Sequence, residues 1–163
     1  MKSKVSGVWK DSVPQAKVLG GFKPTKLGWV RVGGEWRIFY PAYPYYLDMT
    51  VGNSGNNYGV NSTYGQATPN TVGGKTLYDL HAAQTGFLFV SYSMVFILVG
   101  DTRSLNLTHL RIDLLDEVQL TASYSSSTGR TTYSFTYPST LSAQTLWTYL
   151  RSKVGTKVRV RFR

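Results

Sequence analysis

The chain has 163 residues, of which 16% are charged, 12 are tyrosine and none is cysteine. Disulfide bonds and thiolate chemistry are therefore excluded, and the length allows one domain with its own core and an additional arm. The formal net charge of +10 is typical of proteins that bind nucleic acid or acidic partners. The abundance of Gly, Ser, Thr, Tyr and Val favours strands and tight turns over helices.

Three imperfect copies of one short motif lie in the first 40 residues. They read KVSGVWK from residue 4, KVLGGFK from residue 17 and RVGGEWR from residue 31. Glycine in each copy suits the positive φ of a tight hairpin turn, and we expect the valine to pair across the strands with the aromatic residue. Since one hairpin buries too little surface to be stable alone, the sequence predicts an attachment arm over residues 1–40. The partner-binding residues of this arm are predicted to be Val5, Val8, Trp9, Val18, Phe22, Trp29, Val32 and Trp36.

Pro41 and Pro44 mark the end of the arm, because proline fixes φ and lacks the donor that a strand ladder needs. We expect the second domain to cover residues 45–163 and to begin with a strand over residues 45–51. Residues 52–74 are rich in Gly, Asn, Ser and Thr, which predicts a long loop with a short strand at residues 58–60.

A run of 13 mostly apolar residues, 87–99, includes two serines and a tyrosine. Spanning a bilayer takes about 20 apolar residues, so we expect no membrane partner. The run instead predicts buried strands at residues 87–90 and 94–99, or one bent strand. The basic N-terminus is followed by no apolar run, and we expect no signal peptide.

Two further patterns predict antiparallel strands. Period-two alternation over residues 105–114 predicts a half-buried strand with Leu110, Ile112 and Leu114 facing the core. Residues 118–124 and 131–137 flank a turn rich in serine and predict a hairpin.

One segment near the C-terminus predicts a helix. Ser142 suits the N-cap position, and Gly155 is placed to end the helix. Between them, apolar residues recur at helical spacing; they are Leu146, Trp147, Leu150 and Val154. The expected fold class is therefore mainly β, an antiparallel β-sandwich-like domain with one short C-terminal helix, preceded by an extended arm of short β-hairpins.

Catalytic residue types are few. The chain has two histidines and eight carboxylates, and Asp79 and His81 would share one face of a strand without an activated nucleophile nearby. Asp113, Asp116 and Glu117 are the only acidic cluster, and their spacing matches neither a metal site nor a catalytic carboxylate pair. Phosphate-loop and dinucleotide motifs are absent. We therefore predict no catalytic residues, no metal, no cofactor and no enzymatic activity.

The cations concentrate in the arm and in residues 157–163. In the latter, Val158, Val160 and Phe162 are expected to face the core, and the opposite, basic face carries Arg159, Arg161 and Arg163. Alternating cations and aromatic residues could track phosphates and stack bases. Regular alternation instead of a dense block favours acidic faces of partner proteins, and we favour a protein partner over nucleic acid.

A third class of partner is carbohydrate. Tyr43, Tyr45, Tyr58 and Tyr64 surround the Asn-rich segment and would form a glycan platform if their rings lay together. The alternative is that they are strand or core residues, which tyrosine usually is in β proteins.

The copies KVSGVWK and RVGGEWR resemble the N-terminal segments of small virion proteins of tailed bacteriophages. The β-rich domain that follows those segments in such proteins resembles four stretches of this chain. They are residues 76–80, 107–112 and 145–150 and the KVG at 153–155. The resemblance implies a structural protein of the minor-tail or tail-fibre type, present in several copies of a symmetric assembly and docked on other virion proteins in the tail, baseplate or neck. Its location would be the virion, assembled in the host cytoplasm. Capsid decoration, a head fibre and an adsorption module that binds a host-surface glycan remain alternatives, and nucleic-acid binding is the least favoured.

Overall fold

The computed structural model describes the backbone of residues 2–5, 8–11, 15–18, 21–24, 28–32 and 35–40, and all of residues 43–163. Contacts divide the chain into two units, Met1–Ala42 and Tyr43–Arg163. The division falls within the proline-containing segment at residues 41–44, where we expected the boundary.

The described part of the first unit consists of short strands. They are β1 (Lys2–Val5), β2 (Val8–Asp11), β3 (Gln15–Val18), β4 (Gly21–Pro24), β5 (Gly28–Val32) and β6 (Glu35–Tyr40). Consecutive strands pair as three antiparallel hairpins, each a two-stranded sheet of its own. Each copy of the motif spans one hairpin turn, as the glycines predicted.

The register of these hairpins corrects one expectation. In the first copy, Val5 lies opposite Val8 and Lys4 lies opposite Trp9. A two-residue turn sets its two flanking residues opposite each other, so an aromatic residue one position further on faces the basic residue that begins its copy. The same pairing joins Phe22 to Lys17 and Trp36 to Arg31. The expected pairing of valine with the aromatic residue is therefore wrong.

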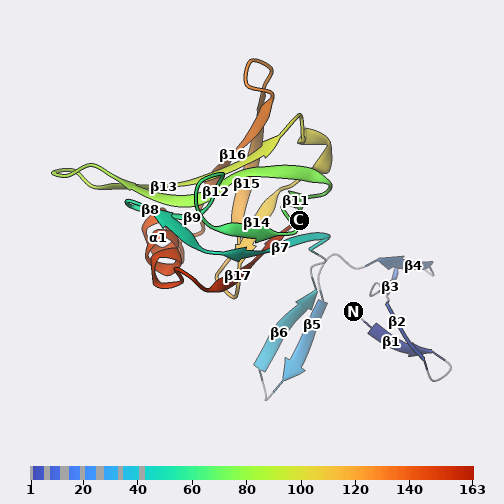
Figure 1. Cartoon of the computed structure of the whole chain (residues 1–163). Coiled ribbons are helices and arrows are strands. Elements are labelled where there is room, and N and C mark those ends of the chain that lie inside the picture. The colour runs from blue at the N-terminus through green and yellow to red at the C-terminus, as the bar shows by residue number, and fades with distance from the viewer. Residues whose placement is uncertain are drawn as a thin grey trace. The chain divides into compact units, whose positions relative to one another are not determined.

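The described strands of the second unit form one antiparallel sheet of 11 strands. They are β7 (Tyr45–Thr50), β8 (Gly52–Ser54), β9 (Asn57–Val60), β10 (Gln66–Thr68), β11 (Thr71–Val72), β12 (Lys75–Thr85), β13 (Ser91–Val99), β14 (His109–Ile112), β15 (Val118–Ser125), β16 (Arg130–Thr136) and β17 (Lys157–Phe162), with a 3-10 turn at Arg103–Leu105. The strand order is β10-β7-β17-β14-β15-β16-β13-β12-β9-β8, and β11 pairs with β12. Strand β7 lies next to one end of this order, and β8 is the other end. Because only Val51 separates these two strands in the chain, both ends of the sheet lie close together and the sheet is nearly closed (Figure 1). The mainly β, sandwich-like fold class is confirmed.

The core joins strands that are far apart in the sequence. Phe96 on β13 stacks on Tyr133 of β16, with 4.6 Å between ring centroids, and on Phe162 of β17 at 5.0 Å. The Tyr133 hydroxyl pairs with the Thr102 hydroxyl at 2.7 Å, so the buried polar group has a hydrogen-bond partner.

Helix α1 (Ala143–Ser152) lies where the apolar spacing predicted it. The Ser142 hydroxyl accepts a hydrogen bond from the Thr145 N–H at 3.1 Å, which confirms the N-cap. Leu146, Trp147 and Leu150 are buried, and the helix packs against β9, β12 and β13 at one end of the sheet (Figure 1).

The chain leaves α1 earlier than expected. Lys153 is the C-cap, so Val154 lies beyond the helix and is 42% exposed. Gly155 has a left-handed φ of 76° and donates its N–H to the Val51 carbonyl at 2.8 Å. That hydrogen bond turns the chain toward β7 and into β17.

Strand β17 confirms which residues of the C-terminal segment face the core, since Val158, Val160 and Phe162 are all buried. Its neighbour β14 confirms only part of the prediction: Leu110 and Ile112 are buried, whereas Leu114 is 86% exposed. The strand ends at Ile112 because Asp113 adopts a left-handed φ of 48°, which breaks the two-residue alternation.

Two other predictions are wrong. Residues 52–74 are not one long loop, since they contain β8, β9, β10 and β11; only the strand at 58–60 was expected. Residues 87–90 are not a buried strand, because β12 and β13 pair as far as Thr85 and Ser91 and leave residues 86–90 as the connecting loop. Among the residues described, no helix is long and apolar enough to cross a bilayer.

Candidate functional site

The arm residues predicted to bind a partner lie outside the described side chains. For Val5, Val8, Trp9, Val18, Phe22, Trp29, Val32 and Trp36 the structure gives strand membership and register only. The described part of the arm is thus a set of paired strands.

The basic face of β17 is occupied by acceptors from the same chain. Arg159 makes two hydrogen bonds to the Asp48 carboxylate on β7, at 2.7 and 2.9 Å, and stacks over the Tyr46 ring at 4.9 Å. Arg161 donates to the main-chain carbonyl of Asp113 at 2.9 Å. The hydrogen bond to Arg159 lowers the pKa of the Asp48 carboxyl below its ordinary value.

Arg163 has the most buried of these pairings. It donates to both oxygens of Glu117, at 3.1 and 2.5 Å, and Tyr43 also donates to that carboxylate. Burial alone would raise the pKa of Glu117, but the hydrogen bonds from Arg163 and Tyr43 outweigh it and the pKa is lowered. Burial, followed by the interaction with Glu117, raises the pKa of Tyr43 to about 12. Tyr43 is therefore a protonated donor that links the first residues of the second unit to β17.

The four tyrosines proposed as a glycan platform pack in different places. Tyr43 is bound to Glu117, and Tyr45 packs against the core. Tyr58 meets the Trp147 ring edge-on at 5.4 Å, and Tyr64 meets the His81 ring at 6.4 Å. With each ring engaged by a different neighbour, the structure does not assemble them into one stacking surface.

Asp79 and His81 do share a strand face, and they form a hydrogen bond. The distance from Asp79 Oδ1 to His81 Nδ1 is 2.6 Å, and the two side chains are 13% and 12% exposed. A carboxylate at this nitrogen orients an imidazole as in hydrolase triads. Within residues 43–163, however, no serine or threonine hydroxyl is hydrogen-bonded to His81, and the neighbouring Tyr64 has its pKa raised to about 12 by burial and by Asp79.

Two features that the sequence interpretation missed are apolar and exposed. The first is the hairpin tip, defined as residues 86–90, where Phe87, Leu88 and Phe89 are 95%, 84% and 90% exposed. The apolar run hid it, but the Thr-Gly pair before the run was an available turn signal. Gly86 has a φ of 88°, and a Cβ there would overlap the Phe89 carbonyl group, so this turn requires glycine.

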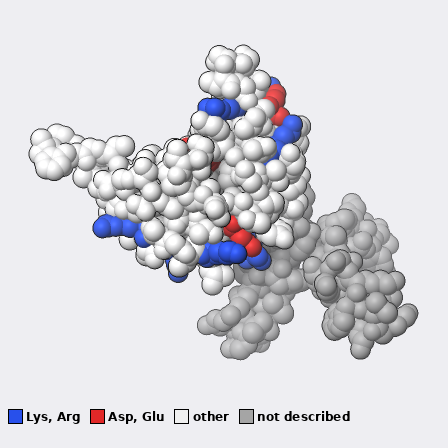
Figure 2. All heavy atoms as spheres, in the orientation of Figure 1, with Lys and Arg blue, Asp and Glu red and all other residues white. Residues whose placement is uncertain are grey.

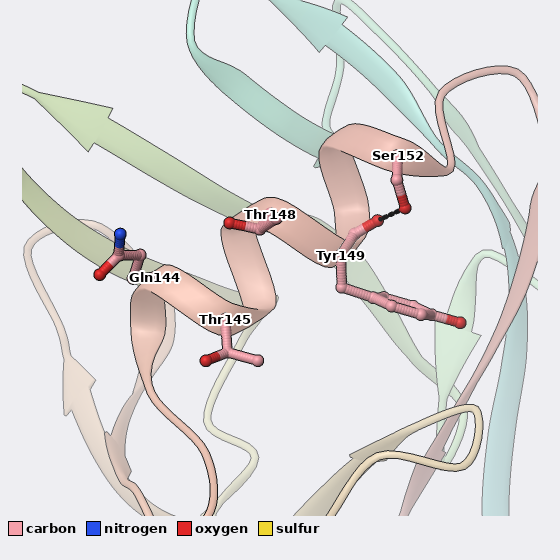
Figure 3. A pocket seen from close by; sticks show the side chains of 5 residues that line it. All are labelled: Gln144, Thr145, Thr148, Tyr149 and Ser152. Carbon is pink, nitrogen blue, oxygen red and sulfur yellow. Dashed lines mark hydrogen bonds between the residues drawn. The ribbon is translucent and has the colours of Figure 1, made fainter.

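The second is a pocket of about 510 Å³ beside α1, named here the Leu114 pocket. It is lined by Asp113, Leu114, Leu115, Tyr149 and Arg161. Tyr149 also borders a depression of about 530 Å³ on the outer side of the helix, which Gln144, Thr145, Thr148 and Ser152 line as well (Figure 3). The Tyr149 side chain extends away from the helix axis in that view, and its hydroxyl donates to Asp113 at 2.5 Å.

Within the described residues, no group of three or more histidine, aspartate and glutamate side chains gathers as a metal ion requires. No family model, curated protein or solved structure matches the chain.

Proposed function

We propose that this chain is a non-enzymatic structural protein of a tailed-bacteriophage virion. It sits in the tail, baseplate or neck and docks on other virion proteins through the hairpins of residues 1–40. The observation that carries the proposal is the pairing of the repeats as three separate two-stranded sheets. A two-stranded hairpin is marginal in water unless a further surface covers it, so three such hairpins in series suit attachment to a neighbouring protein.

The second unit supports the same assignment by being complete without the arm. Its sheet is nearly closed, which leaves few free strand edges, and its core includes residues from both ends of the unit, such as Leu47 and Phe162. A self-contained β domain carried on a repetitive arm is the organisation that the resemblance to virion proteins implies.

Two alternatives have less support. Nucleic-acid binding through β17 would require Arg159 and Arg163 to leave Asp48 and Glu117 before they met phosphates. Glycan binding by the predicted tyrosines would require rings that now pack in separate places to come together.

The test is incorporation into particles. Replacing both Trp9 and Trp36 with Ala removes two aromatic residues from the arm, and we expect the amount of protein in purified virions, measured by mass spectrometry, to fall by at least about tenfold. The matched control is Tyr46→Ala, because Tyr46 is a 52% exposed aromatic residue on β7, and it should be incorporated normally. Circular dichroism should show the same cooperative unfolding in all three proteins.

Normal incorporation of the double variant would rule out attachment through the arm. Immunogold labelling of wild-type particles tests the position, with label expected on the tail, baseplate or neck. Label confined to the capsid would favour a decoration protein. A sub-micromolar DNA affinity at about 150 mM salt, lost when all three β17 arginines are replaced by Ala, would favour the nucleic-acid alternative.

A further inference from the structure

The hairpin tip presents apolar surface in several directions at once. Phe87, Leu88 and Phe89 are consecutive, yet all three are at least 84% exposed. Residues 87–89 form bends in the loop between β12 and β13, so a flat partner would cover only part of this set. The tip is suited to a concave apolar site that surrounds it.

The stem behind the tip carries no charge that would have to be desolvated. Residues 80–100 contain no Asp, Glu, Lys or Arg, and the end of the β12–β13 hairpin projects from the domain without coloured side chains in Figure 2. Burying a charge costs far more than burying a neutral hydroxyl. The whole end of the hairpin can therefore enter a site on another molecule at little electrostatic cost.

The Leu114 pocket offers a concave, partly apolar surface that could receive the apolar hairpin tip. Leu114 is 86% exposed, and the volume of about 510 Å³ falls in the range of about 300–1,000 Å³ that is usual for pockets that hold a small apolar group. Leu115 and the ring of Tyr149 complete its apolar lining.

The oxygens of Asp113 in this pocket already have donors within the chain. The two carboxylate oxygens of Asp113 accept hydrogen bonds from the Arg159 N–H at 2.8 Å and from the Tyr149 hydroxyl at 2.5 Å. The carbonyl oxygen of Asp113 accepts from Arg161 at 2.9 Å. An apolar occupant would therefore leave these oxygens of Asp113 paired.

We propose that the hairpin tip of one copy inserts into the Leu114 pocket of a second copy. The tip and the pocket are different surfaces of one molecule, so the contact is head to tail and repeats from copy to copy, closing into a ring or continuing as a filament. This inference goes beyond attachment through the arm and does not depend on it.

The area available sets the strength of the contact. Aromatic side chains bury about 150–250 Å² each, so Phe87, Phe89 and the smaller Leu88, together with the surface that they cover on the partner, give a total of about 1,000 Å², at the lower limit for a specific interface. We expect a dissociation constant on the order of 10–100 µM. Copies held side by side on one assembly would have a high effective concentration, which would strengthen this weak contact.

A lipid bilayer is a less suitable environment for the tip. Residues 86–90 lie outside the strand ladder, and their backbone N–H and C=O groups would lack partners in hydrocarbon. At the mouth of a protein pocket the same groups stay in contact with water.

The experiment is sedimentation of the full chain over about 5–500 µM, a range that brackets the expected dissociation constant. The tip variant is Phe87→Ser with Phe89→Ser, the pocket variant is Leu114→Asp, and the matched control is Val154→Asp at a 42% exposed apolar position. We expect the wild type and the control to associate, and both test variants to associate at least about 100-fold more weakly.

Mixing the two test variants is the decisive measurement. The pocket variant retains an intact tip and the tip variant an intact pocket, so their mixture should form a one-to-one complex that grows no further. The proposal is overturned if the wild type stays monomeric throughout, if only one variant loses association, or if the mixture stays monomeric. Binding of a monomeric wild type to phosphatidylglycerol vesicles, lost in the tip variant, would replace the second copy with a membrane as the partner.

Discussion

Replacing Trp147 with Ala tests how α1 is held on the sheet. The side chain is 6% exposed and lies between Tyr58 and Tyr92, each with its ring centroid 5.4 Å away. Its indole N–H donates to the Asn56 carbonyl at 2.8 Å. Deleting a buried tryptophan costs about 3–5 kcal/mol, and two aromatic pairs at about 0.5–1.5 kcal/mol each place this site in the upper half of that range.

The variant Trp147→Phe separates packing from hydrogen bonding. It keeps an aromatic ring between the two tyrosines but loses the indole donor. Because the Gln84 N–H also donates to the Asn56 carbonyl, at 3.2 Å, that oxygen keeps a partner, and we expect a loss of only about 1–2 kcal/mol.

The assay is urea unfolding of the full chain followed by far-ultraviolet circular dichroism. Gln144→Ala, at an exposed position of the same helix, is the control and should change the free energy of unfolding by less than about 0.5 kcal/mol. A loss below about 1 kcal/mol for Trp147→Ala, or equal losses for the Ala and Phe variants, would refute the packing described for α1.

Two further substitutions test the sheet and its partly buried ion pair between Glu117 and Arg163. Gly59 has a φ of 154°, and a Cβ there would overlap the Leu80 carbonyl and lie 2.6 Å from the His81 Cα. The control position is Gly129, where φ is 64° and the space is open. Gly59→Ala should therefore lower the free energy of unfolding by at least about 2 kcal/mol more than Gly129→Ala does. Equal thermal unfolding temperatures for those two variants would contradict the close approach of β9 to β12. The pKa of Glu117 is lowered in the folded chain from an ordinary value of 4.5, so the stability it contributes is complete above that pH and is lost as the pH falls through the lowered value. The thermal midpoint should accordingly be higher for the wild type than for Glu117→Gln at pH 6, and the difference should shrink below about pH 4.5; a difference independent of pH would show that the carboxylate is not paired as described.

Local patterns predicted the elements whose determinants lie within a few residues of each other. Ser142 and the spacing of Leu146, Trp147 and Leu150 located α1, since capping and helical periodicity act over one or two turns. The alternation of Val158, Val160 and Phe162 gave the buried face of β17, because a strand in a half-buried sheet has a period of two.

Tertiary structure decided what those elements meet. The acceptors for Arg159 and Arg163 are 111 and 46 residues away in the sequence, so the alternation showed a basic face without showing that Asp48 and Glu117 occupy it. Leu114 followed the period of its strand, but Asp113 turns the backbone to bond β17 and α1, which exposes the leucine. The apolar run at residues 87–90 looked buried because hydrophobicity indicates what gains from burial, whereas the length of the β12–β13 pairing sets where the tip lies. Which distant residues form contacts, and how far a pair of strands extends beyond the buried core, depend on the whole fold.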